Sequence, residues 1–509
     1  MKEEGGLKVP LCATNRINMP ETCEDILSSG DADLVSMARP FLADPDIINK
    51  ANEGRTEDIN TCIGCNQACL DHTFKVSQAL LIPILSPSAL LIWRARLVLF
   101  FSVPRTNPMS RLCLTAPPPR LFALSPHAQL LTASCLVNPS CGYETDLGPA
   151  VAAKISTPPL KVAVVGAGPA GLSAAVTASD RGHTVTLFDQ SDEIGGQFNL
   201  AKKIPGKEEF HETIRYFTER LSKSTVSLKL GKTVGDTDLL GFDRVILATG
   251  VTSRPLAIPG GDHKKVLTYA DVITGTATVG KSVAIVGAGG IGFDVAELLT
   301  HRESDNDPVE AFTREWGVDM EHKSRSGLIG KEVKQLASRK KVYLLQRTEG
   351  KPGAGLGKTT GWIHRLTLAK AGVEMMGGVK EYVKVDDDGL HIVLHKPRGG
   401  WRSPPAEGEE VHEDGSRSML LPVDSVVVCA GQEPLRELQK PLKQSGIPTF
   451  LVGGAEAAGG LDAKRAIDQG TRLAAVLETA KDGSVFNQPV KWEAALVKGI
   501  RRLAGRSFA

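Results

Sequence analysis

The stretch Val162-Ala-Val-Val-Gly166-Ala-Gly168-Pro-Ala-Gly171 decides the fold of this 509-residue chain. It joins a continuous apolar strand, Lys161–Val165, to a sequence that favours a helix. Gly166 permits the tight turn, Gly168 lets the backbone approach a pyrophosphate, and Gly171 allows the helix to pack closely on the strand. The pattern predicts a dinucleotide site whose phosphates face the amino end of the helix.

A carboxylate follows at the distance that a ribose-binding residue needs. The next expected strand, Thr184–Phe188, ends at Asp189, 23 positions after Gly166. The loop Glu193-Ile-Gly-Gly-Gln197 then resembles the segment that passes along the cofactor in FAD-dependent disulfide-reductase-like flavoproteins. We therefore expect FAD at this first site, against the alternative of a glycine turn that binds no ligand.

A second fingerprint, Val283-Ala-Ile-Val-Gly287-Ala-Gly289-Gly-Ile-Gly292, opens another nucleotide fold. Its partner strand, Lys341–Arg347, comes late, because the polar residues 301–336 have the composition of an insertion. Where an NAD site would place an acid, this strand ends in Gln346 and Arg347. A guanidinium pairs with a 2′-phosphate that a carboxylate would repel, so NADPH is favoured. The alternative is that Arg347 is a solvated charge at the strand end.

The order of the remaining segments predicts that the second nucleotide domain is inserted into the first. Residues 243–250 are typical of a late strand of the first sheet, and residues 425–431 of a strand that closes the second. Residues 450–454 then form a further strand before a last helix that starts near Asp462. The expected fold is α/β with two nested Rossmann-like domains.

Three cysteines stand on one short loop, Thr61-Cys62-Ile-Gly-Cys65-Asn-Gln-Ala-Cys69. Thiolates at this spacing suit a cubane iron–sulfur cluster, which takes a fourth ligand from further along the chain. Candidates for that ligand are Cys135, Cys141 and Cys113. Zinc is the competing metal, although the sequence has no second Cys-x2-Cys. Isolated buried cysteines are the alternative without a metal.

Residues 76–132 differ in composition from their surroundings. These 57 residues contain no Asp, Glu, Gly, Lys or Tyr, but carry eight prolines and five arginines. The apolar run Ala79–Trp93 is short for a membrane span and is interrupted by Pro83 and Pro87. A retained intron, encoded from Val76, is the favoured interpretation, and a proline-rich surface loop is the alternative.

The bulk composition excludes several classes of protein. A formal net charge of +2 gives no indication of a nucleic-acid partner or an anionic membrane. Nine cysteines in so long a chain are too few for a secreted disulfide scaffold, and the amino terminus lacks the apolar region of a signal peptide. We expect a soluble intracellular protein, without an indication of its compartment.

The sequence also resembles a specific family, the NADPH-dependent 2,4-dienoyl-CoA reductases of the iron–sulfur flavoprotein type. The resemblance covers about residues 8–75 and 133–480. It rests on Thr14–Asn18, Ser36–Asp44, Cys62–Asp71, Ser134–Pro139, Glu193–Asn199, Lys203–Phe210, Gly355–Arg365 and Leu461–Ile467.

The resemblance implies a route for electrons. NADPH gives a hydride to FAD, electrons pass singly through a 4Fe–4S cluster, and FMN in a TIM barrel reduces an unsaturated acyl-CoA. The implied cluster ligands are Cys62, Cys65, Cys69 and Cys135, and Arg39 would lie near the FMN phosphate. The other cofactor residues expected from motif and resemblance are Gly166, Gly168, Ala170, Gly171, Asp189, Gly196, Gln197, Gly287, Gly289, Gly292, Arg347, Gly454 and Asp462.

The sequence departs from the family in two ways. Sixty-five residues separate Cys69 from Cys135 where the family has about a dozen, an excess that coincides with residues 76–132. Only the last barrel units have counterparts, so the catalytic acid and base of the barrel stay unknown and the FMN site is expected to be incomplete. The expected division is 1–61 for the barrel remnant, 62–150 for the iron–sulfur segment, 160–275 and 427–480 for the FAD domain, 276–426 for the NADPH domain, and 481–509 for a tail.

Three functions follow from these observations. The leading one is a dienoyl-CoA reductase by descent, N-terminally truncated in this sequence. The second is an NADPH diaphorase that feeds electrons to a separate acceptor. The third is a nucleotide-binding fragment without catalysis.

Overall fold

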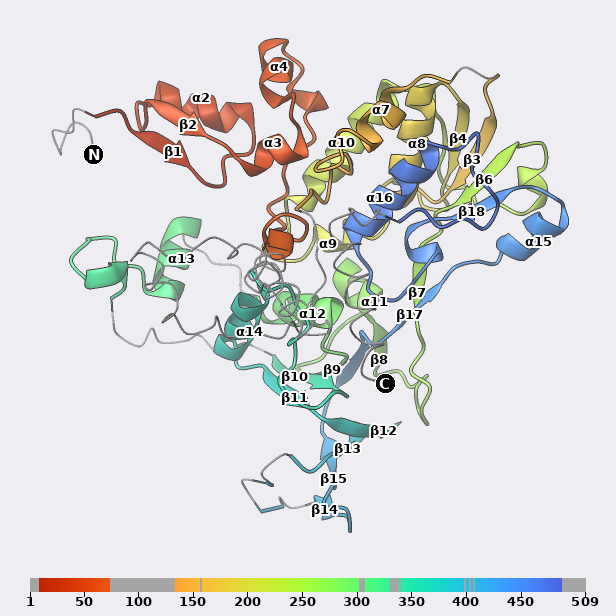
Figure 1. Ribbon diagram of the computed structural model, residues 1–509. Coiled ribbons are helices and arrows are strands. Elements are labelled where there is room, and N and C mark those ends of the chain that lie inside the picture. Colours follow the sequence, from red (N-terminus) through yellow and green to blue (C-terminus); the bar gives the residue numbers. More distant parts are fainter. Residues whose placement is uncertain are drawn as a thin grey trace, which may run out of the picture.

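Two parallel β-sheets, each covered by helices, form the body of the protein (Figure 1). The predicted α/β class is therefore confirmed. The expected insertion at 76–132, Cys113 and most of the tail lie outside the described residues. The computed structural model describes residues 9–73, 133–155, 158–301, 307–329, 338, 340–397, 400–401, 404–405 and 408–487.

The first sheet has the strand order β18-β6-β3-β4-β5, and every neighbouring pair is parallel. Helices α8 and α16 pack on each other against one face, in the same apolar core as the side chains of β3 and β4. The continuous apolar run of the sequence thus forms a strand that is buried on both faces. The elements are β3 (Lys161–Val165), α8 (Pro169–Arg181), β4 (Thr184–Phe188), α10 (Phe210–Ser222), β5 (Ser227–Lys229), β6 (Arg244–Leu247), β18 (Thr449–Leu451) and α16 (Ala463–Ala474).

The second sheet has the order β11-β10-β9-β16-β8 and is also parallel throughout. Its helices α11, α12 and α14 share one apolar core with the strands. The elements are β8 (Val266–Thr268), α11 (Tyr269–Thr274), β9 (Ser282–Val286), α12 (Gly290–Thr300), β10 (Lys341–Gln346), α14 (Gly361–Lys370), β11 (Glu374–Gly377) and β16 (Ser425–Val428).

The chain crosses between the two sheets earlier than the expected boundary at residue 275. Strand β8 pairs with β16 and is the edge of the second sheet, so it lies outside the first domain. The boundary expected at 427 falls inside β16. The two crossing segments, β7 (Val251–Ser253) and β17 (Gln432–Pro434), pair with each other in antiparallel fashion. A strand as short as Val-Leu-Thr carries no motif that assigns it to a sheet, so the sequence could not place this crossing.

A four-stranded antiparallel sheet, in the order β12-β13-β15-β14, packs against the face of the second sheet opposite to its helices. Its strands are β12 (Val379–Val385), β13 (Leu390–Leu394), β14 (Glu410–Val411) and β15 (Arg417–Leu421). The polar insertion expected at 301–336 contains helix α13 (Pro308–Trp316), which begins at Asp307 because that carboxylate accepts hydrogen bonds from the N–H groups of Val309 and Glu310.

The amino-terminal part forms a small unit beside α10 (Figure 1). It consists of a strand, a helix, a second strand and three further short helices, with β1 parallel to β2. Arg215 of α10 donates hydrogen bonds to the carbonyl oxygens of Glu57 and Ile59 and to Oγ1 of Thr61, at 2.5–3.1 Å. These bonds fasten the unit to the first nucleotide domain. Its elements are β1 (Cys12–Thr14), α2 (Pro20–Ser28), β2 (Leu34–Ser36), α3 (Arg39–Ala43), α4 (Ile47–Asn52) and the short helix η1 (Thr56–Asp58).

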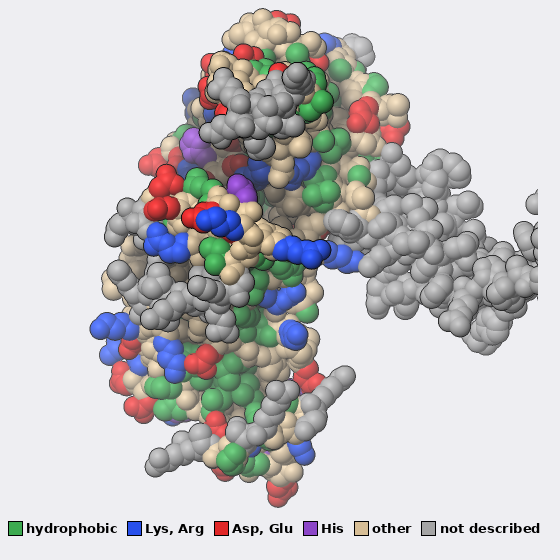
Figure 2. All heavy atoms as spheres, turned by 90° about the vertical axis from the view of Figure 1, so that its left-hand side faces the viewer, with side chains coloured by type: hydrophobic (Ala, Val, Ile, Leu, Met, Phe, Trp, Pro, Cys, Tyr) green, Lys and Arg blue, Asp and Glu red, His purple; other side chains and the backbone are tan. Residues whose placement is uncertain are grey.

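Acidic and basic side chains are mixed over the face that Figure 2 shows, and hydrophobic side chains lie between them. This agrees with the small net charge of the sequence. Among the described residues, no helix has both the length and the apolar character that a membrane crossing requires. The remaining short helices are α7 (Leu147–Ala152), α9 (Phe198–Ala201), η3 (Thr237–Leu239), η4 (Arg325–Gly327), α15 (Gln439–Gln444) and η5 (Gly453–Ala455).

Gly470, in the middle of α16, is a point where helix packing leaves no room for a side chain. A Cβ there would overlap the carbonyl oxygen of Ala170 and Oγ of Ser173 on α8. We expect Gly470→Val to lower the free energy of unfolding by about 1–3 kcal/mol or more, because a backbone oxygen cannot move aside cheaply. Gly148→Ala in α7, where nothing lies within 4 Å, is the matched control and should be neutral or slightly stabilising. Equal stability of the two variants in chemical denaturation would contradict this account.

Candidate functional site

The first glycine turn has the geometry that its sequence predicts. Gly166 has a φ of +107°, and a Cβ there would overlap the carbonyl oxygen of Ala248 on the neighbouring strand end. A Cβ on Gly171 would overlap the carbonyl oxygen of Gly166 itself. Gly168 begins α8, and the nearest atom to a Cβ built on it is 4.0 Å away, so its backbone is open to an approaching group. The amino end of α8 is therefore accessible to a phosphate.

Asp189 lies at the carboxyl end of β4, beside this turn. Its Oδ2 accepts a hydrogen bond of 2.5 Å from the N–H of Ala167, and its Oδ1 accepts one of 2.8 Å from Ser191. The half-buried carboxylate is thus held against the fingerprint by two backbone donors. Its remaining lone pairs are at the edge of the sheet where a ribose is expected.

Two further segments meet at the same turn. Gly196 has a φ of +52°, and a Cβ on it would come within 3.0 Å of Cα of Gly168. Gly454 follows β18, and a Cβ on it would lie 3.2 Å from Cα of Gly250. Asp462 begins α16, where its Oδ1 accepts a hydrogen bond of 2.9 Å from the N–H of Lys464. The Gly453–Gly454 segment meets the turn because a Cβ on Gly453 would lie 2.9 Å from Cβ of Ala170, while Asp462 is placed at the amino end of the helix that packs on α8.

The second fingerprint repeats the geometry of the first. Gly287 has a φ of +110°, and a Cβ on Gly292 would overlap its carbonyl oxygen. Gly289 begins α12, and nothing lies within 4 Å of a Cβ built on it. The amino end of α12 is open in the same way as that of α8. This turn can accept a second dinucleotide.

Arg347 is exposed directly after β10, as the sequence predicts. Burial raises the pKa of Tyr382 on β12 to about 12, and the nearby charge of Arg347 opposes this effect. A groove of about 450 Å³ opens at the carboxyl ends of β10 and β11. It is lined by Glu349, Gly350, Gly377, Gly378, His395, Lys396 and Pro397. Basic groups are thus available at the strand end where a 2′-phosphate is expected.

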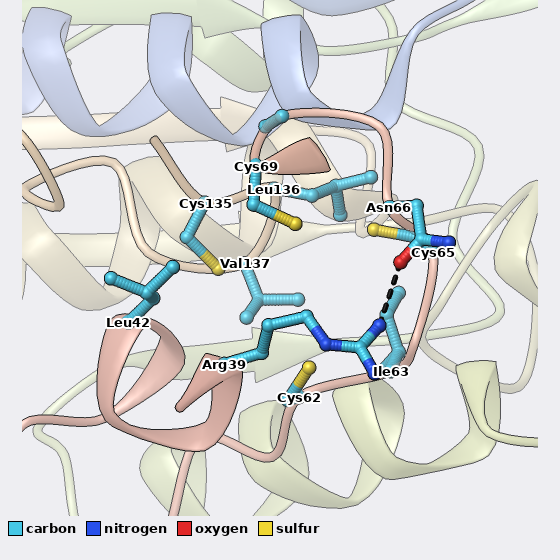
Figure 3. Close-up of a pocket in the computed structure, with 11 residues that line it drawn as sticks. Arg39, Leu42, Cys62, Ile63, Cys65, Asn66, Cys69, Cys135, Leu136 and Val137 are labelled. Atoms are coloured by element: carbon cyan, nitrogen blue, oxygen red, sulfur yellow. Dashed lines mark hydrogen bonds between the residues drawn. The ribbon is translucent and has the colours of Figure 1, made fainter. Parts of the chain in front are cut away.

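Four cysteines line a single small cavity of about 20 Å³ (Figure 3). The sulfur atoms of Cys62, Cys65, Cys69 and Cys135 lie around it, although 65 residues separate the last two cysteines in the sequence. Arg39 also lines the cavity, and its Nη1 donates a 2.6 Å hydrogen bond to Oδ1 of Asn66. The expected contact between Arg39 and an FMN phosphate stays a prediction.

The thiols are held by backbone donors in an apolar environment. Burial raises the pKa of Cys65 and of Cys135 to about 12, and raises that of Cys62 as well. Backbone N–H groups oppose this effect by donating hydrogen bonds to the three sulfurs. The donors are Gly64, Gln67, Val137 and Asn138. Such N–H···S bonds stabilise the thiolate form that binds metals. Bound metal ions would neutralise the negative charge of the buried thiolates that remains.

The geometry favours Cys135 over Cys141 as the fourth cysteine of this group. Cys141 is buried close by, and burial raises the pKa of its thiol to about 11, but it does not line the cavity. Among the described residues, no set of three or more His, Cys, Asp or Glu side chains is placed to hold a metal ion. Within the described residues, the four thiols therefore line one space without forming a ready-made site for a single metal ion.

The cysteine group packs in an apolar cluster of its own, to which α9 and α16 of the first nucleotide domain contribute side chains. Ile63, Leu136 and Val137 pack there with Phe198 of α9 and Ile467 of α16. Phe198 comes directly after the Gly196–Gln197 segment. The segment from Gly196 to Phe198 therefore links the first nucleotide turn to the cluster around the cysteines.

Two residues near the turn carried no signal in the sequence. The buried hydroxyl of Tyr269, at the start of α11, lies 3.4 Å from Oε1 of Gln197 and 3.5 Å from Oε1 of Gln432. Nε2 of Gln432 is buried and has no hydrogen-bond partner within the described part of the chain. These side chains meet where the two nucleotide domains join, so they are candidates for contact with a bound ring system.

Comparison with known proteins agrees with this geometry. Residues 160–457 match the family model described as pyridine nucleotide-disulphide oxidoreductase. Residues 1–58 match the model described as NADH:flavin oxidoreductase / NADH oxidase family. This second match assigns the β1–β2 unit to a short remnant of a TIM barrel.

Three similar proteins extend over most of the chain. A metal reductase of Desulforamulus reducens is 28% identical over 88% of this chain and 55% of its own length. An NADH oxidase of Thermoanaerobacter brockii is 27% identical over 89% of this chain and 53% of its own length. A solved structure of 2-naphthoyl-CoA reductase with 2-naphthoyl-CoA is 25% identical, has a TM-score of 0.66, and covers 93% of this chain and 55% of its own. The chain spans about half the length of the curated relatives it matches.

The carboxylate of Asp189 provides a test of the first site. We expect Asp189→Ala to weaken flavin binding by about 10- to 150-fold, because a charge-assisted hydrogen bond to the ribose contributes roughly 1.5–3 kcal/mol. Flavin retained after dilution and dialysis measures the effect. Asp424→Ala is the control. Oδ2 of Asp424 also accepts backbone hydrogen bonds, from Lys281 and Ser282 at 2.9 Å, but these lie at the amino end of β9, away from either glycine turn. Equal flavin loss in both variants would show that the role of Asp189 is only structural.

Proposed function

Because the chain belongs to the pyridine nucleotide-disulphide oxidoreductase family over more than half of its length, we propose that it is an NADPH-dependent iron–sulfur flavoprotein. In this proposal FAD binds at the first glycine turn, NADPH at the second, and a 4Fe–4S cluster in the cysteine cavity. Electrons pass from NADPH to FAD, then singly to the cluster, and onward to an acceptor.

The link between the first nucleotide turn and the cysteine cluster through residues 196–198 carries this proposal. Phe198 packs on the cysteine group, and Gly196, two residues earlier, faces the Gly168 turn. A flavin held at that turn would be connected to the cysteine group through the segment from Gly196 to Phe198. A cluster at this position would accept electrons one at a time.

The residues present fit the three groups. At each nucleotide turn the space in front of Gly168 or Gly289 is open, where a side chain would block the approach of a pyrophosphate. At the cavity, four thiols with backbone N–H donors provide the ligand set of an iron–sulfur cluster. Bound flavin supplies the exchange between a two-electron hydride and single electrons.

The final acceptor is proposed to be an unsaturated acyl-CoA, reduced at an FMN barrel. The resemblance of the sequence to 2,4-dienoyl-CoA reductases supports this, as does the likeness to a solved 2-naphthoyl-CoA reductase. The described part of the chain contributes two parallel strands of the barrel, β1 and β2. A barrel site is built by loops from many strands, so the residues of this chain act as the electron-input module for that reaction.

The diaphorase reaction tests the proposal on this chain, and Arg347 tests the choice of nucleotide. We expect the chain to reduce an artificial electron acceptor with NADPH. Arg347→Glu should lower kcat/KM for NADPH by about 10- to 150-fold relative to NADH, because it removes a charge-assisted contact of roughly 1.5–3 kcal/mol and adds a repulsive charge. Arg254→Glu, an exposed arginine after β7, is the control. No NADPH oxidation by the flavin-loaded protein would refute the function, and an unchanged preference would show that another group reads the phosphate.

The cysteine cavity predicts a difference between two neighbouring cysteines. We expect Cys135→Ser to lose most of the bound iron and its visible absorbance, because a serine oxygen replaces one of four sulfur ligands. Cys141→Ser should keep both, since Cys141 is buried nearby but does not line the cavity. Iron per chain and the electron paramagnetic resonance spectrum of the reduced protein measure the outcome. Equal iron loss in the two variants would contradict the assignment of the fourth ligand.

A further inference from the structure

One segment, Gly195–Lys207, connects the first glycine turn, the cysteine cluster and the core of the second nucleotide domain. Gly196 lies against the first nucleotide turn, and Phe198 belongs to the core of the cysteine cavity. Ile204 is fully buried in the core of the second nucleotide domain, where Leu200 also packs. The segment therefore leaves the first domain and anchors its far end in the second.

An ion pair joins the carboxyl end of this segment to the second nucleotide domain. Nζ of Lys207 lies 2.5 Å from Oδ1 of Asp294, and the two side chains are 28% and 19% exposed. Asp294 stands on α12, two residues after Gly292 of the second fingerprint. Burial raises the pKa of Asp294, and the ammonium group of Lys207 opposes that shift. A carboxylate so largely buried depends on its partner, because an unpaired charge at this position is costly.

Other charges near Asp294 belong to its own domain. On the next turn of α12, Oε1 of Glu297 accepts a 2.6 Å hydrogen bond from Nδ1 of His364, which lies on α14. Asp294 also feels the charges of Glu297 and His364. Lys207 is thus the partner that reaches Asp294 from outside the second domain.

We propose that Lys207 and Asp294 are positioning residues for hydride transfer between the two nucleotide sites. The crossing segments β7 and β17 form one connection between the domains, and a two-stranded ribbon by itself does not fix the rotation about its axis. The Lys207–Asp294 pair provides a second fixed point, half a turn of helix from the glycines that hold the second nucleotide. Two separated points fix the rotation and so the distance between the two rings.

This inference rests on the proposed function. In the step concerned, a hydride with its two electrons leaves C4 of the nicotinamide of NADPH and enters the flavin ring of FAD, which also takes one proton from solvent. The products are NADP⁺ and reduced FAD. The rate of such a step falls steeply when the two rings are misplaced, by about a hundredfold for roughly 1 Å.

The experiment compares single and exchanged charges. We expect Lys207→Met and Asp294→Asn each to slow flavin reduction by NADPH in anaerobic single-turnover mixing by about 10- to 100-fold. Flavin content and the Kd of NADP⁺ should stay unchanged, because neither side chain belongs to a glycine turn. The double exchange Lys207→Asp with Asp294→Lys should recover part of the rate. Arg16→Met is the matched control. It removes an exposed ion pair of 2.6 Å with Glu209, which stands two residues after Lys207 in the chain.

A second readout does not depend on activity. In flavin-free protein, we expect faster backbone hydrogen exchange over 204–207 and 290–294 in Lys207→Met than in Arg16→Met. Wild-type rates in both single variants, or a loss of rate that the double exchange does not relieve, would overturn the inference. If wild type itself does not oxidise NADPH, the proposed function fails, whereas unchanged exchange in Lys207→Met would overturn the second fixed point separately. Lys207→Arg keeps the positive charge, so it should reduce the flavin with NADPH at the wild-type rate. It is the variant to use if a charge-removing variant does not fold.

Discussion

The contact between two glycines in each fingerprint constrains everything that follows in the structure. Gly171 lies so close to the carbonyl oxygen of Gly166 that a single added carbon would overlap it, and Gly292 repeats this against Gly287. This close approach lets α8 and α12 lie directly on their strands. It aims the open amino end of each helix at the edge of its sheet. Both candidate nucleotide sites, and the position of the cysteine cavity beside the first of them, depend on that placement.

The first nucleotide domain is the centre on which the other parts assemble. The amino-terminal unit is fastened to α10 through Arg215, and the cysteine loop packs on α9 and α16. The second domain is joined through the β7–β17 ribbon and through Lys207. The amino-terminal unit and the cysteine loop meet in one apolar cluster on the first domain, which includes Ile214 of α10.

Polar interactions at these junctions differ in strength according to burial. The Arg16–Glu209 pair is exposed, with side chains 56% and 31% accessible, so water and salt weaken it. The Lys207–Asp294 pair is largely withdrawn from water, and losing one partner leaves a buried charge. The thiols of the cysteine cavity are buried further and rely on backbone N–H donors. Interactions that fix the relative positions of sites are the buried ones.

The sequence by itself determined the two glycine turns, their strands and helices, the strand-end residues Asp189 and Arg347, and the first three cysteines, because each depends on neighbours within a few residues. Only the tertiary structure decided that Cys135 and not Cys141 lines the cavity, that β8 belongs to the second sheet, and that Tyr269 and Gln432 meet at Gln197. These outcomes join residues far apart in the chain, where no periodicity or spacing carries information. Packing of whole domains selects among partners that local sequence leaves equivalent.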